Sequence, residues 1–486
     1  MPELEPEPPD RLGVRSLPGA RPNVPPPAPS DHPPTSDAHR LFLREPSRTP
    51  IRIVRGEGAE LIDEQGRRYL DAAAGAAVAC LGHGRRDVAK VLARQAERLA
   101  FAHPSKFTTR EAEQLAEKLV DRAPAGLDRV LFTSGGSEAT ETAIKLARQV
   151  QLARGQGSRT KVITRRTSYH GATLGALAIS GQAGRRQPFA PMLLTQPMIA
   201  PTSCYRCPFG KEPDSCDVPC ASDLETAVLD VGPENVAAFI AEPIVGSSAP
   251  GRHPPERYWP RIREICDRYG VLFIADEVMS GNGRSGRWWA MQHTNIAPDL
   301  LTTAKGLSAG YSPLGAVLAR EEHYRALRDL PGAFRHGHTF AGNPLSCAVG
   351  DHVIDVIERE GLLPRVAELG ERLKARLQET IGDHPHIGTI RGRGLLMGVE
   401  FVADRATRAP FPAEADVRTL FAHACLDQGV YVYQGGGNVD GRRGDHALLA
   451  PPFVLTDAQV ERLAAGMAAA LDRIAPELAR AAEAAA

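Results

Sequence analysis

Between residues 86 and about 320, short runs of consecutive apolar residues alternate with segments of helical spacing. A strand that is apolar at every position is buried on both faces, which is typical of a mostly parallel sheet covered by helices on both sides. The alternation therefore predicts an α/β domain over residues 86–324, in which ligands bind beyond the carboxyl ends of the strands. The apolar runs are residues 130–132, 161–164, 236–240, 271–275 and 314–318.

The segments on either side of this domain have a different pattern, with shorter strands, glycine turns and longer amphipathic helices. We expect residues 45–85 and 325–486 to fold together into a smaller α+β domain. The expected elements are strands at 51–54 and 59–63, helices at 87–99, 352–360 and 363–381, a strand pair between 392 and 401, and a terminal alanine-rich helix.

The N-terminal segment is rich in proline, since fourteen of the forty prolines lie within the first fifty residues. Such a segment buries too little apolar surface to offset the entropy lost on ordering. The composition therefore predicts that residues 1–44 form a disordered arm. A proline-rich docking peptide is the alternative, and plain disorder is favoured over it.

Charge and hydropathy exclude two classes of partner. The chain has 58 basic and 58 acidic residues in 486, so it has no excess of positive charge to neutralise phosphates, and we expect no nucleic-acid partner. No stretch approaches the roughly 20 apolar residues that a membrane helix needs. The first residues are acidic, where a signal peptide would be basic. We expect a soluble cytoplasmic protein that does not contact membranes.

Two residues at the ends of apolar segments carry the clearest chemical signal. Asp276 ends one segment, and Lys305 ends another twenty-nine positions later. Lys305 is one of only eight lysines against fifty arginines, and its apolar flanks would lower the pKa of its amine. An aldehyde cofactor of the pyridoxal type needs one amine to hold it as a Schiff base and a carboxylate to keep its ring nitrogen protonated. This pairing favours such a cofactor over a lysine that merely extends to solvent at a strand end.

A phosphate-binding turn precedes this pair. Residues 132–139 run from a strand through a glycine turn into a helix, with Gly136 and Ser137 at the helix start. Free backbone N–H groups, a glycine that permits close approach and a serine hydroxyl are suited to binding a phosphate. The alternative is an ordinary helix start, because glycine followed by serine opens many helices.

Further residues are candidates for contacting the rest of the cofactor. Tyr169 follows a strand and can lay its ring on one face of the cofactor, or it can be a core tyrosine. Val278 alternates onto the same side of its strand as Asp276 and can pack against the opposite face. Thr339 lies in a polar loop over residues 335–344, which binds a ligand or a partner, or serves as a plain connecting turn.

These residues together resemble the class III, or omega, aminotransferases, which are fold-type I enzymes dependent on pyridoxal 5′-phosphate. The resemblance covers about residues 45–475. Six blocks occur in family order, and they are Ser134 to Ala139, Tyr169 to Gly171, Glu242-Pro243, Ala275 to Val278, Thr303 to Gly306 and Thr339 to Pro344.

The resemblance implies a role for each matched position. It implies that Lys305 carries the cofactor and moves the proton, that Asp276 pairs with the ring nitrogen, and that Thr339 reaches the cofactor phosphate of a neighbouring subunit. It thereby implies a homodimer with shared active sites, and ping-pong transfer of an amino group from an amine to a keto acid such as pyruvate. The positions expected to contact the cofactor are Gly136, Ser137, Tyr169, His170, Glu242, Asp276, Val278, Lys305 and Thr339.

The sequence departs from the family where the substrate binds. Relatives that bind glutamate through a fixed arginine place it just before an Ala-Pro-Pro stretch, where this chain has Leu448 and Leu449. Arg442 and Arg443 resemble the segment that supplies a mobile arginine in amine–pyruvate relatives, or they are plain surface arginines. Near Ala77 an aromatic residue often narrows the pocket, and only alanines stand here. We therefore expect a roomier pocket for a bulky amine.

Four of the eight cysteines lie within seventeen residues, in an insertion over residues 201–222. Two close pairs suit a four-thiolate zinc site. Reduced thiols in a cytoplasmic loop are favoured over metal, so we predict no metal site. The four residues are Cys204, Cys207, Cys216 and Cys220.

Two other classes of function remain open on the residues alone. The same cofactor and fold also serve epimerases, aminomutases and phospholyases, which the motifs do not separate from transaminases. A binding or scaffold protein without catalysis is the third class, and the intact pair Asp276 and Lys305 argues against it. The leading prediction is a transaminase.

Overall fold

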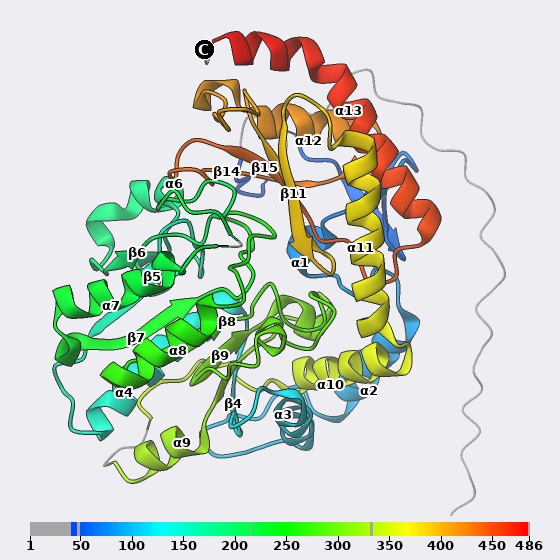
Figure 1. The fold of residues 1–486 in the computed structure, drawn as a ribbon. Helices are drawn as coiled ribbons and strands as arrows, with labels where there is room; N and C mark the ends of the chain where they lie inside the picture. Colours follow the sequence, from blue (N-terminus) through cyan, green and yellow to red (C-terminus); the bar gives the residue numbers. More distant parts are fainter. Residues whose placement is uncertain (1–39, 46–48, 214, 331–333, 485–486) are drawn as a thin grey trace, which may run out of the picture.

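The computed structural model describes residues 40–45, 49–213, 215–330 and 334–484 (Figure 1). Most of the predicted proline-rich arm, residues 1–39, lies outside the described residues. Residues 40–45 are described, and within them Leu41 and Phe42 are exposed. The described residues contain three sheets, of which the largest has seven strands.

The seven-stranded sheet confirms the predicted α/β fold. Its order is β4-β10-β9-β8-β7-β5-β6, and every neighbouring pair is parallel except the two pairs that involve β10. The five apolar runs correspond to β4, β5, β7, β8 and β10. The strands are β4 (Arg129–Thr133), β5 (Lys161–Arg165), β6 (Met198–Ile199), β7 (Val236–Ala241), β8 (Leu272–Asp276), β9 (Leu300–Thr303) and β10 (Gly315–Ala319).

Helices cover both faces of this sheet, which is why its central strands are apolar throughout. Helix α4 packs on one face against Val162, Ile240 and Ile274, whereas α7 and α8 pack on the other against Phe239 and Phe273. These helices lie in the lower left of Figure 1. The helices around this sheet are α3 (Arg110–Arg122), α4 (Gly136–Ala153), α5 (Leu174–Ala178), α6 (Ala183–Arg186), α7 (Pro219–Val231), α8 (Tyr258–Tyr269) and α9 (Glu321–Arg328).

The two smaller sheets join the beginning and end of the chain. Strand β13 pairs in parallel with β3, so the N-terminal and C-terminal segments share a sheet. This pairing confirms that the two ends fold together. The first sheet contains β1 (Ile53–Glu57), β2 (Glu60–Asp63), β3 (Arg68–Asp71) and β13 (Val430–Tyr431), and the second contains β11 (Ile387–Arg393), β12 (Leu396–Phe401), β15 (Asp445–Leu449) and β14 (Tyr433–Gly436).

Long helices pack around these sheets, and one of them begins earlier than its sequence pattern predicts. Helix α10 (Pro344–Arg359) starts eight residues before the predicted residue 352, because the Asn343 side chain accepts hydrogen bonds from the N–H groups of Leu345 and Ser346. The other helices around these sheets are the four-residue α1 (Ala74–Ala77) and the longer α2 (Arg86–Arg98), α11 (Leu362–Ile381), α12 (Val417–Asp427) and α13 (Asp457–Glu483).

The predicted domain boundaries, 45–85, 86–324 and 325–486, stay a prediction.

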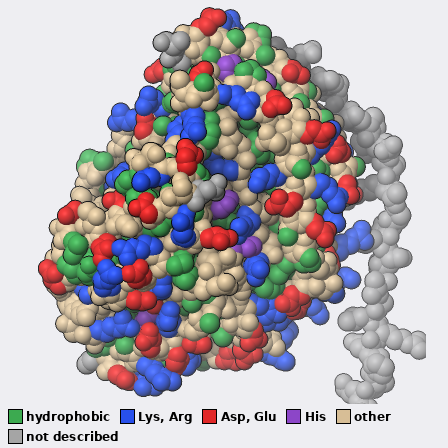
Figure 2. Space-filling view, viewed as in Figure 1, with side chains coloured by type: hydrophobic (Ala, Val, Ile, Leu, Met, Phe, Trp, Pro, Cys, Tyr) green, Lys and Arg blue, Asp and Glu red, His purple; other side chains and the backbone are tan. Residues whose placement is uncertain are grey.

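The surface carries no single dominant charge on the face in view. Figure 2 shows basic and acidic side chains interspersed over this face. Among the helices of the described residues, none is long and apolar enough to cross a membrane.

Candidate active site

Asp276 and Lys305 lie at the same edge of the large sheet. Asp276 is the last residue of β8 and lies opposite Thr302 of the neighbouring parallel strand β9, and Lys305 follows two residues after β9. Both side chains line one pocket of about 270 Å³. The pocket is lined by Arg44, Ala76, Gly136, Ser137, Tyr169, His170, Gly171, Arg185, Glu242, Gly246, Ser247, Asp276, Val278, Met279, Lys305 and Tyr433.

The Asp276 carboxylate is buried and held in one orientation. Its Oδ2 lies 2.6 Å from Nδ1 of His170, whose side chain is fully buried. Its Oδ1 accepts hydrogen bonds from the Val278 N–H at 3.1 Å and from the Thr302 hydroxyl at 3.3 Å. A carboxylate fixed on both oxygens can face a protonated ring nitrogen without reorganising, which is what a pyridoxal ring requires.

The Lys305 amine is partly buried and weakly basic. Burial lowers the pKa of Lys305 from its ordinary value to about 8, although the nearby Asp276 opposes the shift. Its Nζ donates a hydrogen bond to the Ala76 carbonyl at 2.9 Å. The backbone of Lys305 has a φ of +48°, which L residues rarely adopt and which concentrates at functional sites. A substantial fraction of neutral amine near neutral pH suits a lysine that bonds an aldehyde.

The start of α4 lies where the sequence predicts a phosphate-binding turn. A Cβ atom added to Gly136 would lie 2.7 Å from Cγ1 of Val278, so a side chain there would displace Val278. The Ser137 hydroxyl accepts a hydrogen bond from the Ala172 N–H at 3.0 Å and also lines the pocket. N–H groups in the first turn of a helix have no partner within the helix and attract anions. These residues fit a phosphate group.

Tyr169 and Val278 both line the pocket, as the predicted contacts to the two ring faces require. The Tyr169 N–H donates to Glu242 at 3.3 Å, and the Gly246 N–H donates to the other carboxylate oxygen of Glu242 at 3.0 Å. Burial raises the pKa of Glu242 above its ordinary value. Glu242 therefore fixes the backbone of two loops at the pocket wall. The residues present fit a planar aromatic aldehyde with a phosphate.

Several predicted residues do not line the pocket of a single chain. Thr339 is exposed, as are Arg442 and Arg443, and Arg443 forms an ion pair with Asp440 at 2.8 Å. Ala77 is buried against Ile244, Leu396 and Leu448 and does not line the pocket. The alanine that does so is its neighbour Ala76. Their roles in binding the substrate or a partner's cofactor stay predictions.

Arg44, Arg185, Met279 and Tyr433 line the pocket and were not identified from the sequence. The guanidinium carbon of Arg185 lies 4.2 Å from the ring centroid of Tyr169. In a chain with fifty arginines, nothing in the local sequence marks this one. Tyr433 carried a weak signal, since it lies a few residues before the segment predicted to bind the substrate.

That the four cysteines of the insertion bind no metal stays a prediction, and their thiols lie close enough to interact electrostatically. All eight cysteines are free thiols, and Cys216 is buried. Within the described ranges, no group of three or more His, Cys, Asp or Glu side chains is placed to hold a metal ion.

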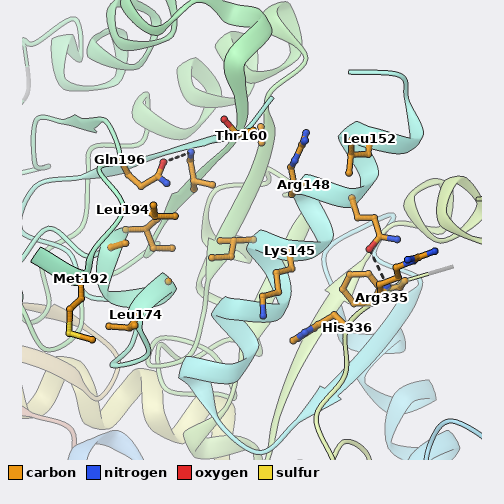
Figure 3. A pocket seen from close by; sticks show the side chains of 18 of the residues that line it. Lys145, Arg148, Leu152, Thr160, Leu174, Met192, Leu194, Gln196, Arg335 and His336 are labelled. Atoms are coloured by element: carbon orange, nitrogen blue, oxygen red, sulfur yellow. Dashed lines mark hydrogen bonds between the residues drawn. The ribbon is translucent and has the colours of Figure 1, made fainter. Parts of the chain in front are cut away.

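A larger hollow of about 850 Å³ lies beside α4, where Val162 of β5 and Ala237 of β7 also line it, and neither Asp276 nor Lys305 does. Figure 3 shows Lys145, Arg148 and Leu152 along α4, with Arg335 and His336 on one side and Met192 and Leu194 on the other. Although this hollow is larger, we do not assign the reaction to it, because its lining combines apolar and basic side chains without an acid–base pair.

The chain is similar to known proteins over most of its length. The sequence profile of the family described as aminotransferase class-III matches residues 43–471. An uncharacterized aminotransferase of Schizosaccharomyces pombe is 39% identical over 425 residues, which cover 87% of this chain and 93% of that protein.

Two further similar proteins have more specific descriptions. A putrescine–pyruvate aminotransferase of Pseudomonas aeruginosa is 36% identical and covers 85% of this chain and 88% of its own length. The crystal structure of an (S)-enantioselective omega-transaminase from Thermomicrobium roseum has a TM-score of 0.84 at 34% identity, covering 90% of this chain and 97% of that one.

Proposed function

Because the chain belongs to the class III aminotransferases, which use pyridoxal 5′-phosphate to move amino groups from amines to keto acids, we propose that its own substrates are a bulky primary or omega-amine and a small keto acid such as pyruvate. The observation that carries the proposal is the convergence of Lys305, Asp276 and the start of α4 on one pocket. A relative described as a putrescine–pyruvate aminotransferase supports an omega-amine donor and pyruvate as acceptor.

Each residue then has one task. The cofactor, when bound, withdraws electrons from the substrate carbon that carries the amino group. The Lys305 amine, with its pKa near 8, takes a proton from that carbon and returns it. Asp276 keeps the cofactor's ring nitrogen protonated, and Gly136 and Ser137 bind its phosphate. Tyr169 and Val278 hold the ring between them and exclude water from its faces.

The size of the amine is inferred from the pocket wall. Ala76 lines the pocket, and the left-handed backbone at Ala74, Gly75 and Ala77 presents it there. A methyl group at this place leaves room that a large aromatic side chain would fill. We infer that the amine can carry a substituent larger than a methyl group on the carbon beside its nitrogen.

We propose a homodimer in which Thr339 reaches the partner's cofactor phosphate. Apolar rings exposed at this loop support the proposal, since Phe340 is 60% exposed and its neighbour Phe101 is 36% exposed. Phe340 contacts Phe101 edge to face at 5.9 Å. Exposed aromatic clusters of this kind mark protein interfaces.

We also propose that the protein works in the cytoplasm, where free cysteines stay reduced.

The test is a panel of amines and keto acids added to the purified protein loaded with cofactor. A transaminase loses the aldehyde absorbance when amine is added and regains it when keto acid is added, in two separable half-reactions. Product release from an amino substrate without any keto acid would instead indicate an epimerase, aminomutase or phospholyase. Sedimentation of wild type and Thr339→Ala at equal concentration tests the dimer separately from the chemistry.

A further inference from the structure

Arg185 places a positive charge in the pocket beside Tyr169. It is the third residue of the short helix α6 (Ala183–Arg186), and it is partly buried. Its guanidinium lies over the Tyr169 ring at 4.2 Å and lines the same pocket as Lys305. A cation on an aromatic face is held in place while its N–H groups remain available around its edge.

No acidic side chain of the described residues pairs with Arg185, and within this part of the chain its guanidinium makes no hydrogen bond. The two carboxylates that line the pocket are engaged elsewhere. Asp276 bonds His170, Val278 and Thr302, and Glu242 bonds two backbone N–H groups. A partly buried guanidinium with all its donors open is suited to a carboxylate ligand, because the planar fork matches two carboxylate oxygens.

Helix α6 is held against the end of β14 and the loop that follows it. The Gln182 side chain donates to the Gly436 carbonyl at 2.8 Å, and the Gly184 N–H donates to the Gly441 carbonyl at 3.0 Å. Gly436 ends β14, whose first residue, Tyr433, also lines the pocket. The backbone on either side of Arg185 is therefore anchored to this segment, and the Tyr169 ring holds its guanidinium in the pocket that Lys305 lines.

Resting on the proposed function, we propose that Arg185 binds the carboxylate of the keto acid and of carboxylate-bearing amines, and that carboxylate-free amines react without using it. This assigns carboxylate recognition to α6 rather than to Arg442 and Arg443. Those two arginines are exposed, and Arg443 is already paired with Asp440. Arg44 also lines the pocket but is exposed and has no aromatic support in the pocket.

The experiment uses two reagents that carry the same aminooxy group, aminooxyacetate and methoxyamine. Both react with the loaded cofactor and change its absorbance, and only aminooxyacetate has a carboxylate. In Arg185→Gln we expect the reaction with aminooxyacetate to slow by about 10- to 100-fold, the usual effect of losing hydrogen bonds to a charged group. The reaction with methoxyamine should keep its wild-type rate.

Controls separate recognition from a structural role. Arg186→Gln changes the neighbouring arginine, which does not line the pocket, and should leave the ratio of the two rates unchanged. Arg185→Lys should restore part of the aminooxyacetate rate, because the charge remains while the planar fork is lost. An absorbance titration should give Arg185→Gln the same dissociation constant for pyridoxal 5′-phosphate as wild type.

Each other outcome overturns the inference. If Arg185→Gln slowed the reactions with both reagents equally, the result would mean that Arg185 only orients Tyr169. A carboxylate-specific loss in Arg44→Gln, or in the double variant Arg442→Gln and Arg443→Gln, with none in Arg185→Gln would assign recognition elsewhere. If neither reagent changed the absorbance of the loaded wild type, the proposed function itself would fail, which is a different result from a variant that reacts normally.

Discussion

The Nδ1 atom of His170 lies 2.6 Å from Oδ2 of Asp276, and both side chains are buried. His170 is itself fixed, since its N–H donates to the Ser180 hydroxyl at 2.9 Å and its carbonyl accepts from the Thr140 hydroxyl at 2.8 Å. The orientation of the aspartate therefore depends on the loop that also carries Tyr169. One loop thus sets both the position of Tyr169 and the orientation of Asp276.

Replacing the carboxylic acid of Asp276 should lower the reaction rate more than it lowers the stability of the fold. Asp276→Asn keeps the shape of the side chain but removes the charge that keeps the ring nitrogen protonated. A hydrogen bond to a charged group is worth about 1.5–3 kcal/mol, so we expect turnover to fall by about 10- to 100-fold. The measurement is the rate of the amine half-reaction, with Asp440→Asn in a surface loop as the control. Turnover unchanged in Asp276→Asn would exclude this role.

Cofactor binding should be sensitive to one glycine of a neighbouring pair. A Cβ on Gly136 would lie 2.7 Å from Val278, whereas a Cβ on Gly135 would meet nothing within 4 Å. Overpacking of this kind costs about 1–3 kcal/mol, so Gly136→Ala should weaken binding of pyridoxal 5′-phosphate by about 5- to 100-fold. Gly135→Ala is the matched control and should bind within about twofold of wild type. Equal effects of the two substitutions would contradict the close packing of α4 on Val278.

Uptake of the cofactor should depend on pH through Lys305. Only the neutral amine attacks an aldehyde, and the lowered pKa means that it is neutral above about 8 rather than above its ordinary value near 10.5. The neutral fraction, and with it the uptake rate, should rise about tenfold per pH unit below 8 and then level off. Stopped-flow absorbance of the cofactor-free protein gives this profile. A rate still rising tenfold per unit at pH 9.5 would mean that burial does not lower the pKa.

Substituting Ala76, rather than Ala77, should change the size of the amine that the pocket accepts. Ala76→Phe adds a ring at the pocket wall and should lower the rate with a bulky amine by about tenfold or more relative to a small linear amine. Ala77 has a φ of +62° and is buried, so a large residue there should destabilise the fold instead. Rates with a matched pair of amines and a thermal melt distinguish the two effects. Unaltered selectivity in Ala76→Phe would argue against the inferred size of the amine.

The central strands were predictable because their apolar runs follow directly from burial on both faces. The direction of β10 was not, since the run 314–318 would look the same in a parallel or an antiparallel strand. The start of helix α10 was predicted too late, because glycine and polar residues interrupt its apolar spacing before residue 352.

The location of Asp276 and Lys305 in one pocket was predictable from residue type and spacing. Arg185 was not, because its contact with Tyr169 depends on how two loops fold. The pocket is lined by Ala76 and not by the predicted Ala77. Positive φ angles in this stretch break any simple alternation in the direction of successive side chains.

The most direct test concerns the bond between Lys305 and the cofactor. Borohydride reduces a Schiff base to a stable secondary amine, so the loaded protein is reduced, digested and examined by peptide mass spectrometry. The account predicts a pyridoxyl phosphate adduct on the peptide that contains Lys305 and on none of the peptides containing the other seven lysines. An adduct on a different lysine, or no adduct in protein that retains the cofactor's colour, would contradict it.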